Sequence, residues 1–153
     1  MNHRETLGWR EWVSFPELGI PRIKAKVDTG ARTSCLHAFK VDTFERDSAP
    51  WVRFHIHPQQ GNADEVVICE APLVDQRTVR DSGGHEELRH VILTTLVIGD
   101  RTVSAELTLT DRDLMSFRVL VGRSAIRRQF VVDPGRSYLS GNKPPRTGSP
   151  RND

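Results

Sequence analysis

The sequence predicts an all-β fold, either a barrel or a sandwich, built as one domain. Apolar residues mostly recur at every second position, in short runs that end at Gly, Pro, Asp or Asn. This alternation is typical of strands with one buried face. A chain of 153 residues, of which 37% are hydrophobic, fits a single compact core. The chain has no internal repeat, so a duplicated half is excluded.

The first two strands are expected at residues 9–15 and 22–27, joined as a hairpin across residues 16–21. In the second strand, Ile23 and Val27 share one face with the alanine between them, because successive side chains point to opposite sides of a strand. Basic residues occupy the other face. We therefore expect one face of this strand to be buried.

The middle of the chain supplies four more strands. Residues 51–57 alternate between apolar and polar side chains, residues 58–62 break the run with proline and glycine, and residues 65–71 resume it. Residues 91–98 and 102–110 are rich in Thr, Val, Leu and Ile and are connected by Gly-Asp. Because Gly-Asp suits the positive φ angles of tight turns, these two runs form the clearest predicted hairpin.

The C-terminal part is expected to close the domain. Residues 119–121 form a short apolar strand, residues 124–129 have the length and composition of one or two helical turns, and residues 130–132 form a last strand. Residues 140–153 hold glycines and prolines among polar residues. Such a segment buries too little apolar surface to order itself, so we expect a disordered tail after a domain of residues 1–139.

The charge balance restricts the partners. With 22 basic and 20 acidic residues the formal charge is +2, which predicts no nucleic-acid and no membrane partner. Residues 1–12 lack the apolar run of a signal peptide, and we expect a cytoplasmic protein. Cys35 and Cys69 are too few to staple a secreted fold, so we interpret them as reduced, buried thiols.

The sharpest chemical feature is Asp28-Thr29-Gly30, where an alternating strand ends in an acid, a hydroxyl and a glycine. Gly30 permits close backbone approach and Thr29 can hydrogen-bond across to nearby backbone, so the Asp28 carboxylate can be held in a fixed pose. The alternative is an ordinary turn at the end of a strand, since these residue types favour turns.

Four separate segments of the chain carry a resemblance to known proteins. They are residues 23–34 with 36–38, residues 79–85, residues 107–112 with Met115, and residues 120–123 with 132–134. Together they resemble the retropepsin-like aspartic peptidases and, more narrowly, the RimK- or LysX-associated family known as ATP-dependent zinc proteases. The resemblance implies a mostly β, closed acid-protease-type barrel with one short helix near the C-terminus, and catalytic roles for Asp28, Thr29 and Gly30.

Aspartic chemistry requires a partner for Asp28. Two carboxylates that share one proton supply a general acid beside a general base. The chain has a single Asp-Thr-Gly and no repeat, so the second carboxylate must come from a second copy across a two-fold axis. The hypothesis therefore requires a homodimer, unless Asp111 or Asp113 approaches Asp28.

The resemblance also indicates the substrate. It places Arg32, Arg80, Ser82, Arg112 and Arg123 near the cleft as substrate-binding residues, with the loop around Ser82 as a flap or, alternatively, an ordinary surface loop. Arginines pair bidentately with carboxylates. The family's association with ligases that add glutamates to protein ends makes a peptide or protein with a glutamate-rich tail the expected substrate. The alternative is a non-catalytic module that binds acidic peptides.

Three other kinds of site have less support. No His-Glu-x-x-His helix is present. His55 and His57 share a strand face and could bind zinc with a third ligand, but exposed strand histidines are the commoner case. We therefore expect no metal and no other cofactor, with a zinc-dependent protease as the alternative. No phosphate-binding glycine loop supports ATP dependence. Ser82 and His85 lack the nucleophile elbow of a serine hydrolase.

Overall fold

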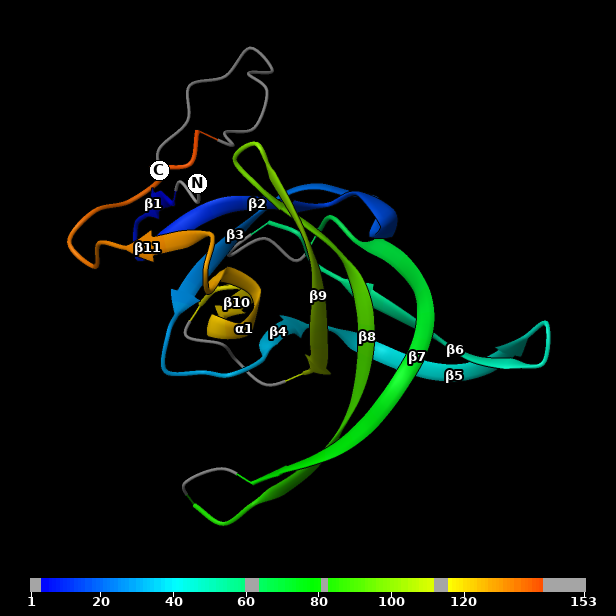
Figure 1. The fold of residues 1–153 in the computed structure, drawn as a ribbon. Coiled ribbons are helices and arrows are strands. Elements are labelled where there is room, and N and C mark those ends of the chain that lie inside the picture. The colour runs from blue at the N-terminus through cyan, green and yellow to red at the C-terminus, as the bar shows by residue number, and fades with distance from the viewer. Residues whose placement is uncertain (1–3, 60–63, 81–82, 112–115, 142–153) are drawn as a thin grey trace.

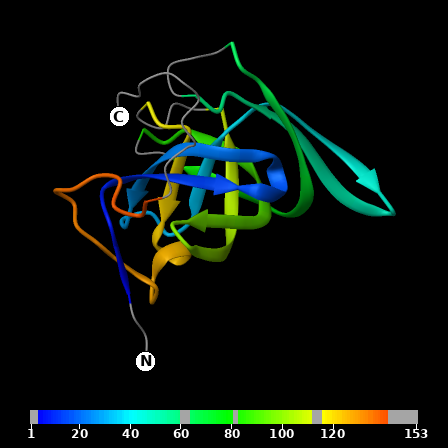
Figure 2. The same ribbon diagram turned by 90° about the horizontal axis from the view of Figure 1, so that it is seen from above.

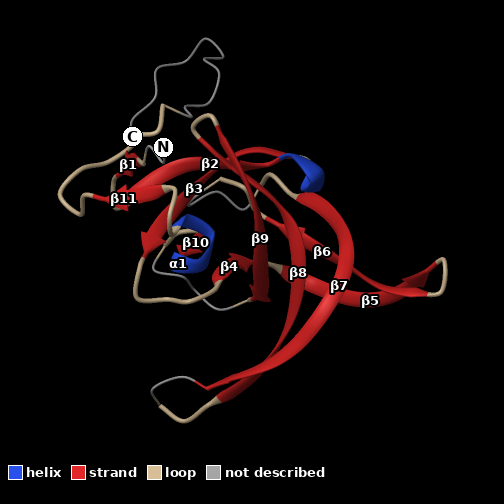
Figure 3. Ribbon diagram, viewed as in Figure 1, coloured by secondary structure: helices blue, strands red, loops and turns tan. Residues whose placement is uncertain are grey.

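The structure, a computed structural model, describes residues 4–59, 64–80, 83–111 and 116–141. Strands dominate it, as Figure 3 shows. The helical elements in these ranges are a 3-10 turn, η1 (Pro16–Leu18), and a short helix, α1 (Arg123–Ile126); neither is long and apolar enough to cross a membrane. The strands are β1 (Glu5–Leu7), β2 (Arg10–Phe15), β3 (Ile20–Asp28), β4 (Ser34–His37), β5 (Phe39–Arg46), β6 (Ala49–Ile56), β7 (Val67–Arg80), β8 (Glu86–Ile98), β9 (Arg101–Thr110), β10 (Val119–Gly122) and β11 (Phe130–Val132).

Six strands close into a barrel. They follow the order β2, β3, β10, β4, β9 and β8, and the pairing of Ser14 on β2 with Val97 on β8 completes the ring. β7, β6 and β5 continue the sheet beyond β8, and the β5–β6 hairpin reaches away from the barrel in both views (Figure 1, Figure 2). β1 and β11 form a separate parallel pair. The predicted closed barrel with one short helix near the C-terminus is confirmed.

The apolar faces predicted from alternation form the core. Val52, Phe54 and Ile56 are fully buried, as is Ile23, while Val27 is 8% exposed. A slip of one residue in any of these strands would turn its apolar face to solvent, so burial fixes the register. Both predicted hairpins are present, β2 with β3 and β8 with β9.

Several strands differ from the sequence prediction. β1, β4 and β5 were not expected, and β8 begins at Glu86 rather than at residue 91. β7 continues past residue 71 to Arg80, where it pairs with the start of β8. Most side chains of β5 and of the outer half of β7 are exposed or half-buried. Neither segment has the single buried face that produces alternation, so only its backbone pairing reveals it as a strand.

The chain after β11 docks back onto β2. Glu11 is fully buried, and its carboxylate accepts hydrogen bonds from the backbone N–H groups of Gly8, Leu139 and Ser140 at 2.6, 2.9 and 3.0 Å. Such bonds offset the cost of burying a charge. Ser140, the first residue of the predicted tail, is thus anchored; residues 142–153 lie outside the described residues.

Candidate active site

Asp28 stands at the end of β3, where three strands meet. β10 lies between β3, to which it is parallel, and β4, to which it is antiparallel. The chain leaves β3, turns through residues 29–33 and returns as β4 on the other side of β10 (Figure 1). Gly122, the last residue of β10, pairs with Asp28. Two segments about ninety residues apart in sequence are therefore brought together, as the resemblance implies.

The turn after β3 fixes the Asp28 carboxylate. The backbone N–H of Gly30 donates to Asp28 Oδ1 at 3.0 Å, and the N–H of Ala31 donates to the Asp28 carbonyl at 3.2 Å. Asp28 is half-buried, whereas Thr29 and Gly30 are exposed. The turn therefore presents Asp28, Thr29 and Gly30, which were predicted to be catalytic, at the surface, with one carboxylate oxygen of Asp28 already bonded.

The start of α1 holds this turn from behind. The backbone N–H groups of Arg123 and Ser124 donate to the carbonyls of Ala31 and Arg32 at 2.8 and 3.1 Å, and Ser124 Oγ donates to the Arg32 carbonyl at 2.6 Å. Arg123 Nη1 lies 3.3 Å from the Thr29 carbonyl oxygen and 3.3 Å from that of Gly30. The Arg123 guanidinium thus supports the turn, and its predicted role in binding substrate stays a prediction.

Gly122 makes the close approach between the two segments feasible. A Cβ atom at this position would lie 2.7 Å from the Thr33 carbonyl carbon and 3.0 Å from the Ala31 carbonyl oxygen. The buried N–H of Gly122 donates to Ser34 Oγ at 3.0 Å. Only glycine fits here, because any side chain would push the turn away from β10.

Asp111, one of the two acids that could replace a second copy, does not lie beside Asp28. Asp28 pairs with Gly122 on β10, and Gly122 is in turn level with Thr33, the residue before β4. His37, four positions after Thr33, pairs with Thr110, the last residue of β9. Asp111 follows Thr110 and is therefore five positions along the strands from the level of Asp28. At ~3.3 Å per residue this places Asp111 roughly 16 Å away along the strand direction. Asp113 lies outside the described residues.

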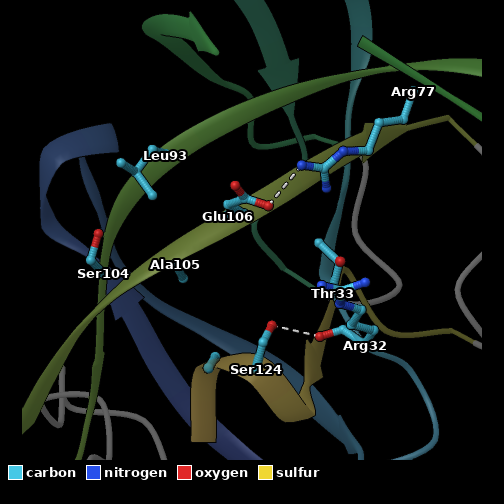
Figure 4. Close-up of a pocket in the computed structure, with 9 residues that line it drawn as sticks. Arg32, Thr33, Arg77, Leu93, Ser104, Ala105, Glu106 and Ser124 are labelled. Carbon is cyan, nitrogen blue, oxygen red and sulfur yellow. Dashed lines mark hydrogen bonds and ion pairs between the residues drawn. The ribbon is translucent and has the colours of Figure 1, made fainter. Parts of the chain in front are cut away.

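A cavity of about 530 Å³ lies beside the turn (Figure 4). Thr33 is level with Glu106 on β9, which pairs with Leu93 on β8, so this row of residues shares the sheet face of Asp28. The volume is within the usual range for ligand sites. The residues that line the cavity are Arg32, Thr33, Arg77, Leu93, Ser104, Ala105, Glu106, Ser124 and Ala125.

The cavity contains two arginines. The Arg32 guanidinium has no hydrogen bond or ion pair with any residue that the structure describes. Arg77 Nη2 pairs with Glu106 at 3.0 Å and its Nε with Asp75 at 2.9 Å. These two carboxylates raise the pKa of Arg77, Glu106 more strongly. Arg77 was not predicted from the sequence, because the strand before it was expected to end at residue 71.

The other predicted substrate residues do not gather at this cavity. Arg80 ends β7 at the tip of the long hairpin and pairs with Glu86 at 3.0 Å, with both side chains more than half exposed. It is not among the cavity-lining residues. Ser82 and Arg112 lie outside the described residues. β7 and β8 form the hairpin that leads to this tip, and its role as a flap stays a prediction.

A second polar network lies on the same face of the sheet, where the start of β8 meets the end of β9. Arg89 Nε pairs with Glu87 at 2.8 Å, Thr110 Oγ1 donates to the same carboxylate, and Arg89 Nη1 lies 3.8 Å from Cys35 Sγ. Burial raises the pKa of the Cys35 thiol, and it raises the pKa of Cys69 to about 12. Both cysteines are free and buried, as predicted.

The histidines do not assemble a metal site in the described part of the chain. His57 stacks on Phe39 with ring centroids 4.4 Å apart, and His55 tilts against the same ring at 5.5 Å. No group of three or more His, Cys, Asp or Glu side chains suited to a metal occurs among the described residues. These histidines therefore do not fit the zinc named in the resemblance, and we derive no step through a metal.

Comparison with curated proteins finds relatives named probable alpha-L-glutamate ligase. The chain is 44% identical over 137 residues to the protein of Shewanella pealeana, 46% over 131 residues to that of Desulfotalea psychrophila, and 45% over 142 residues to that of Parasynechococcus marenigrum. These matches cover 90%, 86% and 93% of this chain but 30%, 28% and 30% of the relatives. The chain thus spans less than a third of their length.

A solved structure supports the fold. The crystal structure of a Legionella pneumophila protein of unknown function matches with a TM-score of 0.75 and 24% identity, covering 90% of this chain and 99% of that one. Residues 6–143 match the RimB-like family, described as the retropepsin-like aspartic endopeptidase RimB. That description names an aspartic peptidase rather than a zinc protease. Because the match spans most of the sequence, this chain belongs to the RimB-like family of retropepsin-like aspartic endopeptidases.

Proposed function

We propose that this protein is a homodimeric aspartic peptidase that hydrolyses peptide bonds in acidic, glutamate-rich segments. The observation that carries the proposal is the fixed pose of Asp28, with its turn bonded to β10 and α1 and its carboxylate facing outward. One Asp28 removes a proton from the attacking water, and the Asp28 of the second subunit protonates the leaving amide nitrogen. Water adds across the peptide bond, giving an acid and an amine.

The second subunit is expected to cover an apolar groove next to the turn. Thr29 is one of its lining residues, and Val131 in it is 44% exposed. A partner seated there would bury this apolar surface and bring a second Asp28 close to the first. The groove is lined by Thr29, Arg123, Ile126, Arg127, Phe130, Val131, Val132 and Pro134.

The acidic substrate is supported by charge and by the relatives. Arg32 directly follows the catalytic turn and is a cation without a described partner. The relatives carry a name that involves glutamate ligation. A hydrolase acting on glutamate-rich segments would reverse such a reaction. The alternative, a module that only binds acidic peptides, predicts the same cavity but no cleavage.

The deciding experiment replaces Asp28 by asparagine. This change removes the shared proton but keeps the shape, so cleavage of a peptide with an oligoglutamate end should vanish while binding is retained. Cleavage is followed by chromatography and binding by fluorescence anisotropy, each also after treatment with a chelator. Undiminished cleavage by the variant would refute the aspartic mechanism, and loss of cleavage on chelation would favour a metal.

The dimer is tested by Val131→Arg. A buried, unpaired guanidinium in the contact should separate the subunits and abolish cleavage, because each monomer then holds a single carboxylate. Sedimentation gives the oligomeric state, and the melting temperature reports folding. A cleaving monomer would contradict the proposal.

A further inference from the structure

The two arginines of the cavity differ in their partners. Arg32 has no described partner, whereas Arg77 has two, Asp75 at its Nε and Glu106 at its Nη2. Of these carboxylates, Glu106 lines the cavity and Asp75 does not. In Figure 4 the pair of Arg77 and Glu106 lies on the side of the space away from Ser124.

The charges that line the cavity are not all paired. Arg77 is matched by Glu106 and Asp75, whereas no carboxylate among the described residues is paired with Arg32. A carboxylate of a bound ligand would supply the charge that Arg32 lacks. The serine and threonine side chains that line the cavity add hydroxyl groups, and Leu93 is the one large apolar side chain in the lining. This composition suits a side chain that ends in a carboxylate on a short apolar stem.

We propose that the cavity binds one carboxylate side chain of the substrate between Arg32 and Arg77, and that Glu106 occupies the place of that carboxylate in the free protein. The inference rests on the proposed function, which places an acidic substrate at Asp28. Arg77 and Glu106 then determine specificity, because the Glu106 carboxylate competes with the substrate carboxylate for Arg77.

The exchange is physically easy. The side chains of Arg77 and Glu106 are 37% and 46% exposed, and ion pairs at such exposure contribute little. Asp75 holds the Nε side of the guanidinium independently of Glu106. Arg77 therefore keeps its orientation when Glu106 leaves, and its freed donors can bond an incoming carboxylate bidentately.

The cavity lies within reach of a substrate bound at Asp28. The row from Asp28 through Gly122 and Thr33 to Glu106 crosses three strand spacings. At ~4.8 Å each this is about 14 Å, which an extended peptide spans in about four residues. The carboxylate that the cavity recognises therefore belongs to a residue a few positions from the bond that is cut.

The test measures peptide binding in the Asp28→Asn background, where nothing is cleaved. The probes are a fluorescent hexaglutamate peptide and its hexaglutamine counterpart, followed by anisotropy. Glu106→Gln should tighten binding of the glutamate peptide about three- to tenfold, since competition and repulsion are both removed. Arg32→Gln and Arg77→Gln should each weaken it about tenfold. Binding of the glutamine peptide should not change.

The matched control is Glu70→Gln. Glu70 also pairs with exposed arginines, Arg46 at 2.6 Å and Arg53 at 2.7 Å, but on the β5–β6–β7 arm. This variant should bind both peptides as the parent does. Unchanged or weaker binding of the glutamate peptide by Glu106→Gln would overturn the proposal, as would equal or undetectable binding of the two peptides.

The same series separates this inference from the proposed function. If the protein with Asp28 intact cleaves neither peptide, the peptidase proposal fails, but the binding series still decides the role of the cavity. If it cleaves both peptides with equal kcat/KM and Glu106→Gln leaves that ratio unchanged, the cavity inference and the preference for acidic segments fail, while the aspartic peptidase activity stands. Melting temperatures of all variants should agree, because every substituted side chain in the cavity is partly exposed.

Discussion

The two sides of the turn after β3 are built differently. Behind the turn, Ser34 and Gly122 are buried, and backbone and hydroxyl hydrogen bonds hold the turn together with the exposed Arg123 side chain. In front of it, the cavity wall carries exposed ion pairs centred on Arg77. Buried hydrogen bonds are costly to break, whereas exposed ion pairs are cheap to exchange. The rear thus fixes Asp28, and the front is free to adapt to a substrate.

The largest effect is expected at the rear, for Gly122→Ala. The new methyl would lie 2.7 Å from the Thr33 carbonyl carbon, so the turn must move. Overpacking of this kind costs about 2–3 kcal/mol, and a shift of the turn by ~1 Å lowers activity about a hundredfold. Thermal unfolding and peptide cleavage measure the two effects.

Gly135→Ala is the matched control for this change. Its Cβ would meet Asp133 Oδ1 at 3.5 Å, an ordinary contact. We expect a change in stability within about 0.5 kcal/mol. Equal melting temperatures for the two alanine variants would show that the rear of the turn accommodates a methyl group without cost. This would contradict the conclusion that the rear fixes Asp28.

Ser34→Ala should have the next largest effect. Ser34 is 1% exposed and its Oγ accepts the hydrogen bond of the Gly122 N–H. Without it, a buried donor is left unsatisfied, at a cost of about 1–3 kcal/mol. Ser104→Ala, at an exposed position of the cavity wall, should change stability by less than about 0.5 kcal/mol. Denaturant titration measures the free energy of unfolding of both variants. A larger loss for Ser104→Ala than for Ser34→Ala would contradict the conclusion that the rear of the turn is the more firmly held side.

Arg123→Gln separates fixing the turn from stabilising the fold. Arg123 is exposed, but its Nη1 reaches the carbonyls of Thr29 and Gly30. We expect a loss of stability below about 1 kcal/mol and a loss of kcat of about tenfold or more, since the turn can shift. Arg123→Lys should recover part of the activity. If KM rises and kcat is kept, Arg123 binds substrate, as the sequence had suggested.

The sequence predicts the rear of the site better than the front. Asp28, Gly122 and the strands that hold them are predictable because glycines, buried alternation and the resemblance all converge there. The cavity wall is not predictable. Arg77 lies in a stretch of β7 without a buried face, and Glu106 alternates as one polar residue among several on β9. Their meeting depends on the pairing of β7 with β8, which no local pattern encodes.

The smallest effect is expected at the front, for Asp75→Asn. The hydrogen bond from Arg77 and that from the Gln76 backbone lower the pKa of Asp75. A lowered pKa in the folded state gives stability that is present above the unfolded pKa and is lost as the pH falls through the folded one. Because the Asp75 side chain is 47% exposed, solvent screens this contribution. The variant and the parent should therefore melt together at pH 7 and again at a pH below the folded-state pKa of Asp75. A parent that is more stable only at pH 7 would show that the front wall is as firmly built as the rear, and would weaken the case that Glu106 yields its place to a substrate carboxylate.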